Sequence, residues 1–106
     1  MSSLTVQLAA QNDQLSLLRS LISEDPELLN SIDADDRTAL HWAASSGADE
    51  VARYLIDHKA EIDKGDASGW TPLHIAASAG QETIVKELVG AGADVNRRNN
   101  KGLTPL

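Results

Sequence analysis

The sequence predicts an all-α protein, a solenoid in which one helix-turn-helix unit recurs along the chain and stacks on its neighbours. Three observations support this fold class. Threonine recurs at equal spacing, at Thr38, Thr71 and Thr104. Residues 33–65 and 66–98 are identical at 11 of 33 positions. Apolar residues within each unit recur at helical spacing, so we expect the repeated unit to be a pair of short helices.

The first helix of the unit is clearest in "GWTPLHIAASAG", which begins at Gly69. Thr71 is suited to cap this helix, and Pro72 is suited to its first turn because proline has no N–H to lose there. A narrow apolar face follows at Leu73, Ala76 and Ala77. Small side chains let neighbouring helices approach closely, and Gly80 then ends the helix.

A second helix follows, with its apolar face at Ile84, Val85, Leu88 and Val89. Pairs spaced i, i+4 are expected on the outer surface, Glu82 with Lys86 here and Asp49 with Arg53 one unit earlier. Gly92 is expected to end the helix in the left-handed conformation. The preceding unit has Lys59 at this position, where a positive φ costs a non-glycine residue about 1 kcal/mol.

The repeat divides the 106 residues into one domain of four parts. We predict an N-terminal capping unit at 1–32, full units at 33–65 and 66–98, and the start of a further unit at 99–106. The first unit is a weaker copy that aligns at an offset of 34 and has Gln7 where the later units have His41 and His74. Terminal units depart from the pattern because one of their faces meets water. We expect the chain to be a fragment of a longer array.

Composition and motifs argue against several functions. The net charge of −7 disfavours nucleic acid and anionic membranes, and no signal peptide or long apolar run is evident. The acidic run at residues 33–37 lacks the glycine and the distal glutamate of a calcium loop. No phosphate-binding, zinc or nucleophile motif occurs. We therefore expect no catalysis, cofactor, metal or small-molecule substrate. The absence of cysteine fits a reducing compartment.

The phrases "DRTALHWA" and "SGWTPLHIAASAG…GADVN" resemble the ankyrin repeat, which carries T-P-L-H-x-A once in each unit of its array. The resemblance implies an ankyrin-repeat solenoid of stacked helix-turn-helix units with β-hairpin loops. It also implies that His41 and His74 bond the neighbouring turn through their ring nitrogens. Ankyrin arrays bind proteins on a concave surface made by the loops and the inner helices.

Nearly the whole chain is similar to the opening repeats of ankyrin-repeat chaperones that assist assembly of the proteasome 19S regulatory particle. That resemblance implies a cytoplasmic and nuclear protein that binds the C-terminal domain of a proteasomal ATPase subunit. The residues implied in this contact belong to the loops and the inner helices. They are Asp35, Asp36, Arg37, Trp42, Ser45, Asp66, Ser68, Trp70, Ser78, Asn99 and Lys101.

Other interpretations stay open from the sequence. The array is also compatible with a different scaffold, such as a kinase inhibitor or signalling adaptor, with an engineered binder, or with an ankyrin prefix to an enzyme. Trp70 is the strongest candidate anchor for a partner, since exposing a tryptophan is costly. The alternative is that Trp70 packs only between adjacent loops. Trp42 is expected to be partly buried on the inner face.

Overall fold

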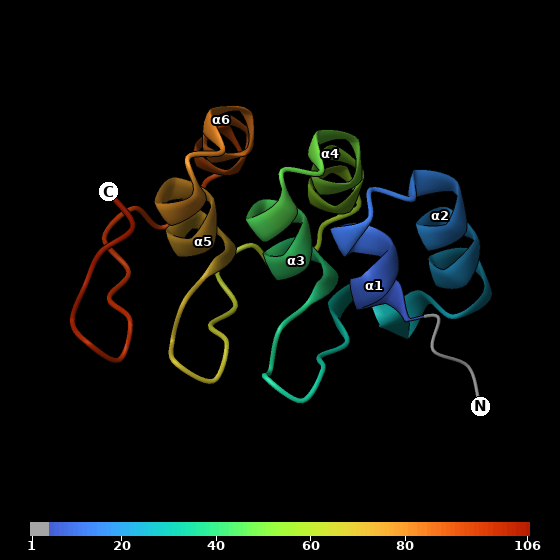
Figure 1. The fold of residues 1–106 in the computed structure, drawn as a ribbon, viewed down its shortest axis with the longest axis horizontal. Helices are drawn as coiled ribbons and strands as arrows, with labels where there is room; N and C mark the ends of the chain where they lie inside the picture. The colour runs from blue at the N-terminus through green and yellow to red at the C-terminus, as the bar shows by residue number, and fades with distance from the viewer. Residues whose placement is uncertain (1–4) are drawn as a thin grey trace.

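Three antiparallel helix pairs stand side by side and make a block of 38 × 25 × 20 Å. The computed structural model describes residues 5–106, so the first four residues of the predicted 1–32 unit lie outside it. Figure 1 shows α1, α3 and α5 in one row and α2, α4 and α6 in a second row above it in that view. The helices are α1 Val6–Gln11, α2 Leu15–Glu24, α3 Ala39–Ser46, α4 Asp49–Asp57, α5 Pro72–Ala79 and α6 Glu82–Gly90.

The inner helices α3 and α5 begin at the predicted threonine caps. Thr71 Oγ1 accepts a hydrogen bond from His74 N at 3.3 Å, and His74 Nδ1 accepts one from Thr71 N at 3.2 Å. Thr38 and His41 form the same reciprocal cap on α3. The histidine of each repeat thus has one ring nitrogen committed to its own helix start, which satisfies backbone donors that the helix leaves unpaired.

The core lies between the two helix rows and consists mainly of leucine and alanine. Leu18, Leu55 and Leu88 are completely buried and come from successive outer helices. Burying one such side chain stabilises a fold by about 1.5–3 kcal/mol. Alanines of the inner helices fill the space between α1, α3 and α5, and their small size allows the close stacking predicted from sequence. The fully buried members are Ala10, Ala39, Ala43, Ala44 and Ala76.

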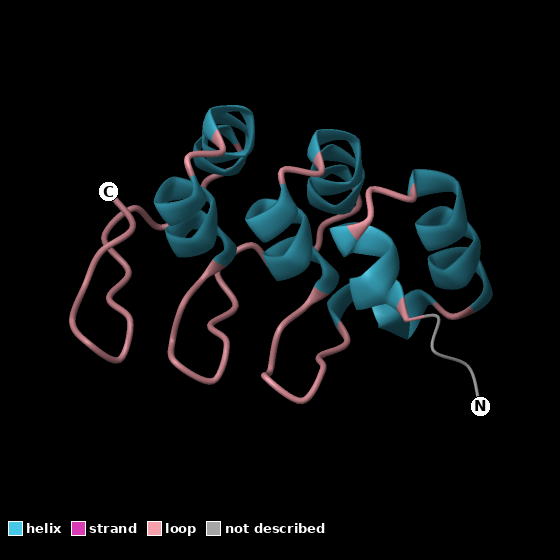
Figure 2. Cartoon of the chain, in the orientation of Figure 1, coloured by secondary structure: helices cyan, strands magenta, loops and turns pink. Residues whose placement is uncertain are grey.

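The loops between units extend away from the helices as three parallel fingers (Figure 2). The chain is folded back in each finger, and a backbone hydrogen bond closes the turn, such as Asp66 N to Trp70 O at 2.9 Å. Adjacent fingers are joined by one backbone bond each, from Ala67 N to Asp35 O and from Asn100 N to Ser68 O, both 3.0 Å. The fingers follow a hairpin path, but no strand is assigned between residues 5 and 106.

The first unit differs from the others in the segment that follows its second helix. Asp25 caps a 3₁₀ helix at Pro26–Asn30, which takes the place of an open loop. Gln7 occupies the histidine position, and its Nε2 donates to Ser31 O at 3.0 Å and to Arg37 O at 3.5 Å. The amide therefore reaches the first finger much as the histidines reach the later ones.

The ends of the outer helices α4 and α6 have the predicted left-handed residues. Gly92 has φ of +96°, and Lys59 has φ of +68°, so the conformation expected from their alignment is present in both units. Of the helices within residues 5–106, none combines the length and the apolar character that crossing a bilayer requires.

The ion pairs predicted within the outer helices are not formed. Arg53 does not pair with Asp49, and its Nη2 instead lies 3.3 Å from Glu87 Oε1, because an arginine side chain reaches the neighbouring helix as easily as its own. Glu82 and Lys86 make no ion pair either. The outer row is therefore joined by a charge contact between α4 and α6, in place of contacts within each helix.

Candidate protein-binding surface

An acidic or amide side chain at the base of each finger fixes its turn. Asp33 Oδ1 accepts from Asp35 N at 2.9 Å and from Arg37 N at 3.0 Å. Asp66 and Asn99 make the same pair of bonds in the next two fingers. Each turn is therefore held by one side-chain oxygen, which sets the direction of the residues that follow it.

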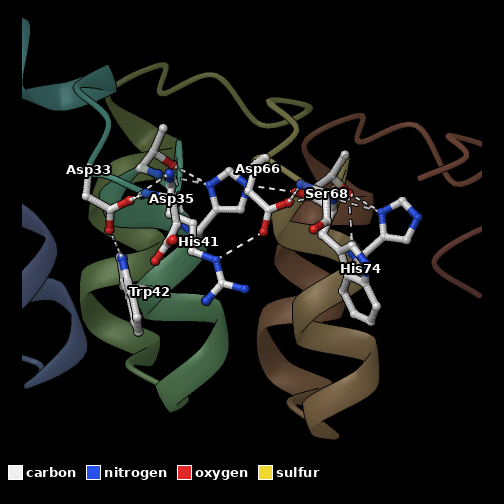
Figure 3. A network of polar contacts seen from close by, with 12 residues as sticks. Asp33, Asp35, His41, Trp42, Asp66, Ser68 and His74 are labelled. Atoms are coloured by element: carbon white, nitrogen blue, oxygen red, sulfur yellow. Dashed lines mark hydrogen bonds and ion pairs between the residues drawn. The ribbon is translucent and has the colours of Figure 1, made fainter. Parts of the chain in front are cut away.

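The second carboxylate oxygen of each aspartate binds a side chain on the inner surface. Asp33 Oδ2 accepts from Trp42 Nε1 at 2.7 Å, and Asp66 Oδ2 accepts from Arg37 Nε at 3.0 Å. The Arg37 guanidinium also lies over the Trp42 ring, 5.2 Å from its centroid. Figure 3 shows Asp33 beside Trp42, and it shows Asp66 on the adjacent finger. The result is a continuous polar chain from one finger to the next.

These contacts favour the ionised forms of both aspartates. Burial acts to raise the pKa of Asp33, but the bonds from Trp42, Arg37 and Asp35 outweigh it and lower the pKa. Burial likewise acts to raise the pKa of Asp66, and the bonds from Trp70, Ser68 and Arg37 lower it overall. Both side chains are negative at neutral pH and keep Arg37 and Trp42 in place.

The histidines fasten each inner helix to the following finger, as the family resemblance implied. His41 Nε2 lies 2.9 Å from Trp70 O, and His74 Nε2 lies 2.8 Å from Leu103 O. Burial lowers the pKa of His41, although its bond to Trp70 and the charge of Asp66 act in the opposite direction. For His41, a neutral ring with its proton on Nε2 donates to Trp70 O and accepts from Thr38 N at Nδ1.

The fingers and the inner helices enclose a groove of about 290 Å³. Six residues predicted from the sequence line it: Arg37, Ser45, Asp66, Ser68, Trp70 and Ser78. Ile75 and Ala79 complete the lining and add apolar surface. Trp70 is half-buried, with its ring 5.7 Å from that of His74. The groove thus combines an aromatic face, a fixed cation and small hydroxyl side chains.

The other predicted residues lie outside the groove lining. Asp35, Asp36 and Lys101 are exposed on the fingers, and Trp42 is half-buried beneath Arg37. Only 6 % of Asn99 is exposed and its oxygen holds the third finger turn, and its contact with a partner stays a prediction. Asp66 does line the groove, although only 4 % of its side chain is exposed.

Sequence reasoning missed Asp33 and Ile75 as parts of this surface. The signal for Asp33 was present, because it precedes Asp66 by one repeat period and Asn99 by two, in the same register. Ile75 aligns with Trp42, which the resemblance implied as an inner-helix contact. The arrangement presents groups for binding a protein side chain or helix. No cluster of three metal-ligating side chains is found in the part of the chain that the structure describes.

Comparisons with known proteins agree with this geometry. Residues 6–99 match the family model described as ankyrin repeats in three copies. The chain is 44 % identical over 65 residues to 26S proteasome non-ATPase regulatory subunit 10 of Rattus norvegicus, covering 61 % of this chain and 28 % of that protein. The human protein of the same name is 45 % identical over 67 residues, with 62 % and 30 % covered.

An enzyme also matches, over a shorter stretch. Serine/threonine-protein kinase 12 of Arabidopsis thaliana is 54 % identical over 37 residues, which covers 35 % of this chain and 8 % of the kinase. The matches to the rat and human proteasome subunits span less than a third of those proteins.

Proposed function

The chain belongs to the ankyrin-repeat family, and we propose that it is a non-catalytic scaffold that binds another protein through the groove between its fingers and inner helices. The observation that carries the proposal is the fixed pair of anchors on the groove wall. Trp70 offers a half-buried aromatic face, and Arg37 is held by Asp66 Oδ2 at 3.0 Å. Tryptophan and arginine are the residues that most often dominate binding energy at protein interfaces.

We further propose that the partner is the C-terminal domain of a proteasomal ATPase subunit and that the protein is a gankyrin-like assembly chaperone. Support comes from the similarity to the rat and human proteasome subunits. The mechanism would be steric, since an occupied ATPase tail domain is unable to dock on the core particle until its partner subunits are in place. The same proposal locates the protein in the cytoplasm and the nucleus.

Electrostatic complementarity would set the orientation of the partner. Because Nε of Arg37 is engaged by Asp66, the other guanidinium nitrogens are left to bind a carboxylate. The exposed Asp35 and Asp36 favour a partner surface with basic residues beside that carboxylate. Charges of this kind contribute more to association rate and register than to affinity.

The test is binding of a recombinant ATPase tail domain by isothermal calorimetry. Trp70→Ala combined with Arg37→Glu should weaken binding by about 2 kcal/mol or more, which is about 30-fold. Arg37→Gln with Trp70→Ala repeats the test without repulsion from Asp66. Arg53→Gln, on the outer helices, is the matched control and should bind normally. Unchanged binding by the double variants would refute the site, and absence of binding by the wild type would refute the partner.

A further inference from the structure

A second, larger groove lies on the outer face, between α2 and α4. Its volume is about 780 Å³, and it is separate from the groove between the fingers and the inner helices. The lining is polar. It consists of Leu15, Ser16, Arg19, Ser20, Ser23, Glu24, Tyr54 and His58.

Comparison with the next pair of outer helices shows what is unusual about this groove. Between α4 and α6, Arg53 lies 3.3 Å from Glu87. Arg19 aligns with Arg53 at the offset of the first unit, and Tyr54 aligns with Glu87 at the repeat period. Arg19 is therefore the equivalent of Arg53, but the equivalent of its partner Glu87 is Tyr54, which carries no negative charge. Between residues 5 and 106, no carboxylate forms an ion pair with the Arg19 guanidinium.

The wall opposite Arg19 is aromatic and held in place. The Tyr54 and His58 rings are stacked, with centroids 4.0 Å apart and an interplanar angle of 30°. His58 Nδ1 donates to Tyr54 O at 2.8 Å, which fixes the imidazole against the end of α4. The other ring nitrogen of His58 stays available to a ligand.

We propose that this outer groove is a second binding site and that it takes an acidic peptide segment of a protein partner. A partner carboxylate would bind Arg19 in the way that Glu87 binds Arg53. The hydroxyls of Ser16, Ser20 and Ser23 are exposed along α2 and supply further donors. Backbone and side-chain carbons of the segment would pack on the Tyr54–His58 wall.

The charges around the groove limit the kind of segment that fits. Glu24 lines the same groove and would repel a carboxylate beside it. The bound segment should therefore place its carboxylate next to Arg19. The whole chain carries a net charge of −7, so long-range attraction does not assist the encounter. Recognition is therefore local and short-ranged.

The experiment is an NMR titration of the ¹⁵N-labelled chain with a hexaglutamate peptide and, separately, a hexaglutamine peptide. At about 100 mM NaCl the Debye length is about 10 Å, which leaves close pairs intact. We expect hexaglutamate to shift the amides of residues 16–23 and 54–58. Hexaglutamine should bind more weakly, because it lacks the charge that Arg19 recognises.

Matched variants decide between this site and general attraction to arginine. Arg19→Gln should weaken hexaglutamate binding about fivefold, the scale of one exposed ion pair. Arg53→Gln should leave the outer-groove shifts unchanged, because Arg53 is paired with Glu87. Arg37→Gln should also leave them unchanged, because Arg37 lies in the other groove. The proposal is overturned if Arg53→Gln weakens binding as much as Arg19→Gln, or if hexaglutamate produces no shift at residues 16–23 and 54–58.

Discussion

Asp33, Asp66 and Asn99 hold one position in three fingers, but their remaining side-chain atoms meet different surroundings. The second oxygen of each aspartate accepts a donor, Trp42 or Arg37, whereas Nδ2 of Asn99 is buried without a partner. The repeat period predicts the shared turn. It does not predict these partners, because Trp42 and Arg37 are replaced by Ile75 and Trp70 in the next unit.

The backbone conformation of Lys59 destabilises the fold. Its φ is +68°, and the side chain is exposed, so no packing offsets the strain. We expect Lys59→Gly to raise the free energy of unfolding by about 1 kcal/mol. Urea denaturation monitored by circular dichroism measures this change.

The control for Lys59 is Asp36→Gly, at another left-handed position with φ of +60°. Aspartate tolerates this conformation better than lysine, so the gain should be smaller. An equal or larger gain at Asp36, or no gain at Lys59, would contradict the strain argument.

At the scale of the element, the helices were predictable because their signals are local. Threonine caps, glycine ends and apolar spacing all lie within a single helix or next to its ends. The fingers were predicted only in outline, since their shape depends on contacts between successive loops, such as Asn100 N to Ser68 O. The Arg53–Glu87 pair was missed for the same reason.

Stacking of the fingers predicts different costs for the same substitution at Gly69 and Gly102. Both have positive φ, +79° and +78°. A Cβ at Gly69 would lie 2.6 Å from Asn100 Oδ1 and 2.9 Å from Asn100 N, whereas a Cβ at Gly102 meets nothing within 4 Å. We expect Gly102→Ala to cost about 1 kcal/mol and Gly69→Ala about 2 kcal/mol or more.

Thermal melts of the two glycine variants, combined with the exchange rate of the Asn100 amide, test this difference. The Asn100 amide bonds the second finger, so Gly69→Ala should speed its exchange and Gly102→Ala should not. If the two variants lose the same stability, contact between the fingers contributes little to the stability of the fold.

The histidine contact between helix and finger predicts how stability depends on pH. Because the pKa of His41 is lowered on folding, the unfolded chain binds the proton more readily. Stability from His41 is full above the unfolded value of about 6.5 and is lost as pH falls through the folded value. The lowered pKa values of Asp33 and Asp66 add a second loss below about pH 4.

Urea midpoints between pH 8 and pH 3 should therefore fall in two stages. His41→Gln should remove the upper stage, since Gln7 makes the equivalent finger contact in the first unit without a titrating group. If the loss of stability at the higher pH persists in His41→Gln, a group other than His41 causes it.

At the scale of the molecule, the family resemblance implied a surface of loop and inner-helix residues but not the depth at which each of them lies. Arg37 comes from the unit at 33–65, whereas Trp70 and Ser78 come from the unit at 66–98, and stacking of the two units brings them together around one groove. Burial of Asn99 and of the Asp66 carboxylate was not predictable, because it depends on the depth at which each finger meets its inner helix.

Stacked units contact only their neighbours, so the position of a unit in the row determines how far a defect spreads. Leu55 and Leu88 are both completely buried and hold equivalent places on α4 and α6. Leucine to alanine at such a site costs about 2–5 kcal/mol. Leu88→Ala affects the last helix pair, which has a neighbour on one side within the described chain, whereas Leu55→Ala affects the pair in the middle.

Native-state hydrogen exchange separates the two cases. Leu88→Ala should speed exchange in α5 and α6 through local opening and leave α1–α4 protected, because the first two pairs keep their shared interface. Leu55→Ala should lower protection in all three pairs, because the middle pair supports both interfaces. Uniform loss of protection in Leu88→Ala would mean that the row unfolds as one unit. Under local opening, by contrast, the groove between the fingers and inner helices is lost together with the last helix pair, since Trp70, Ile75 and Ser78 lie on or beside α5.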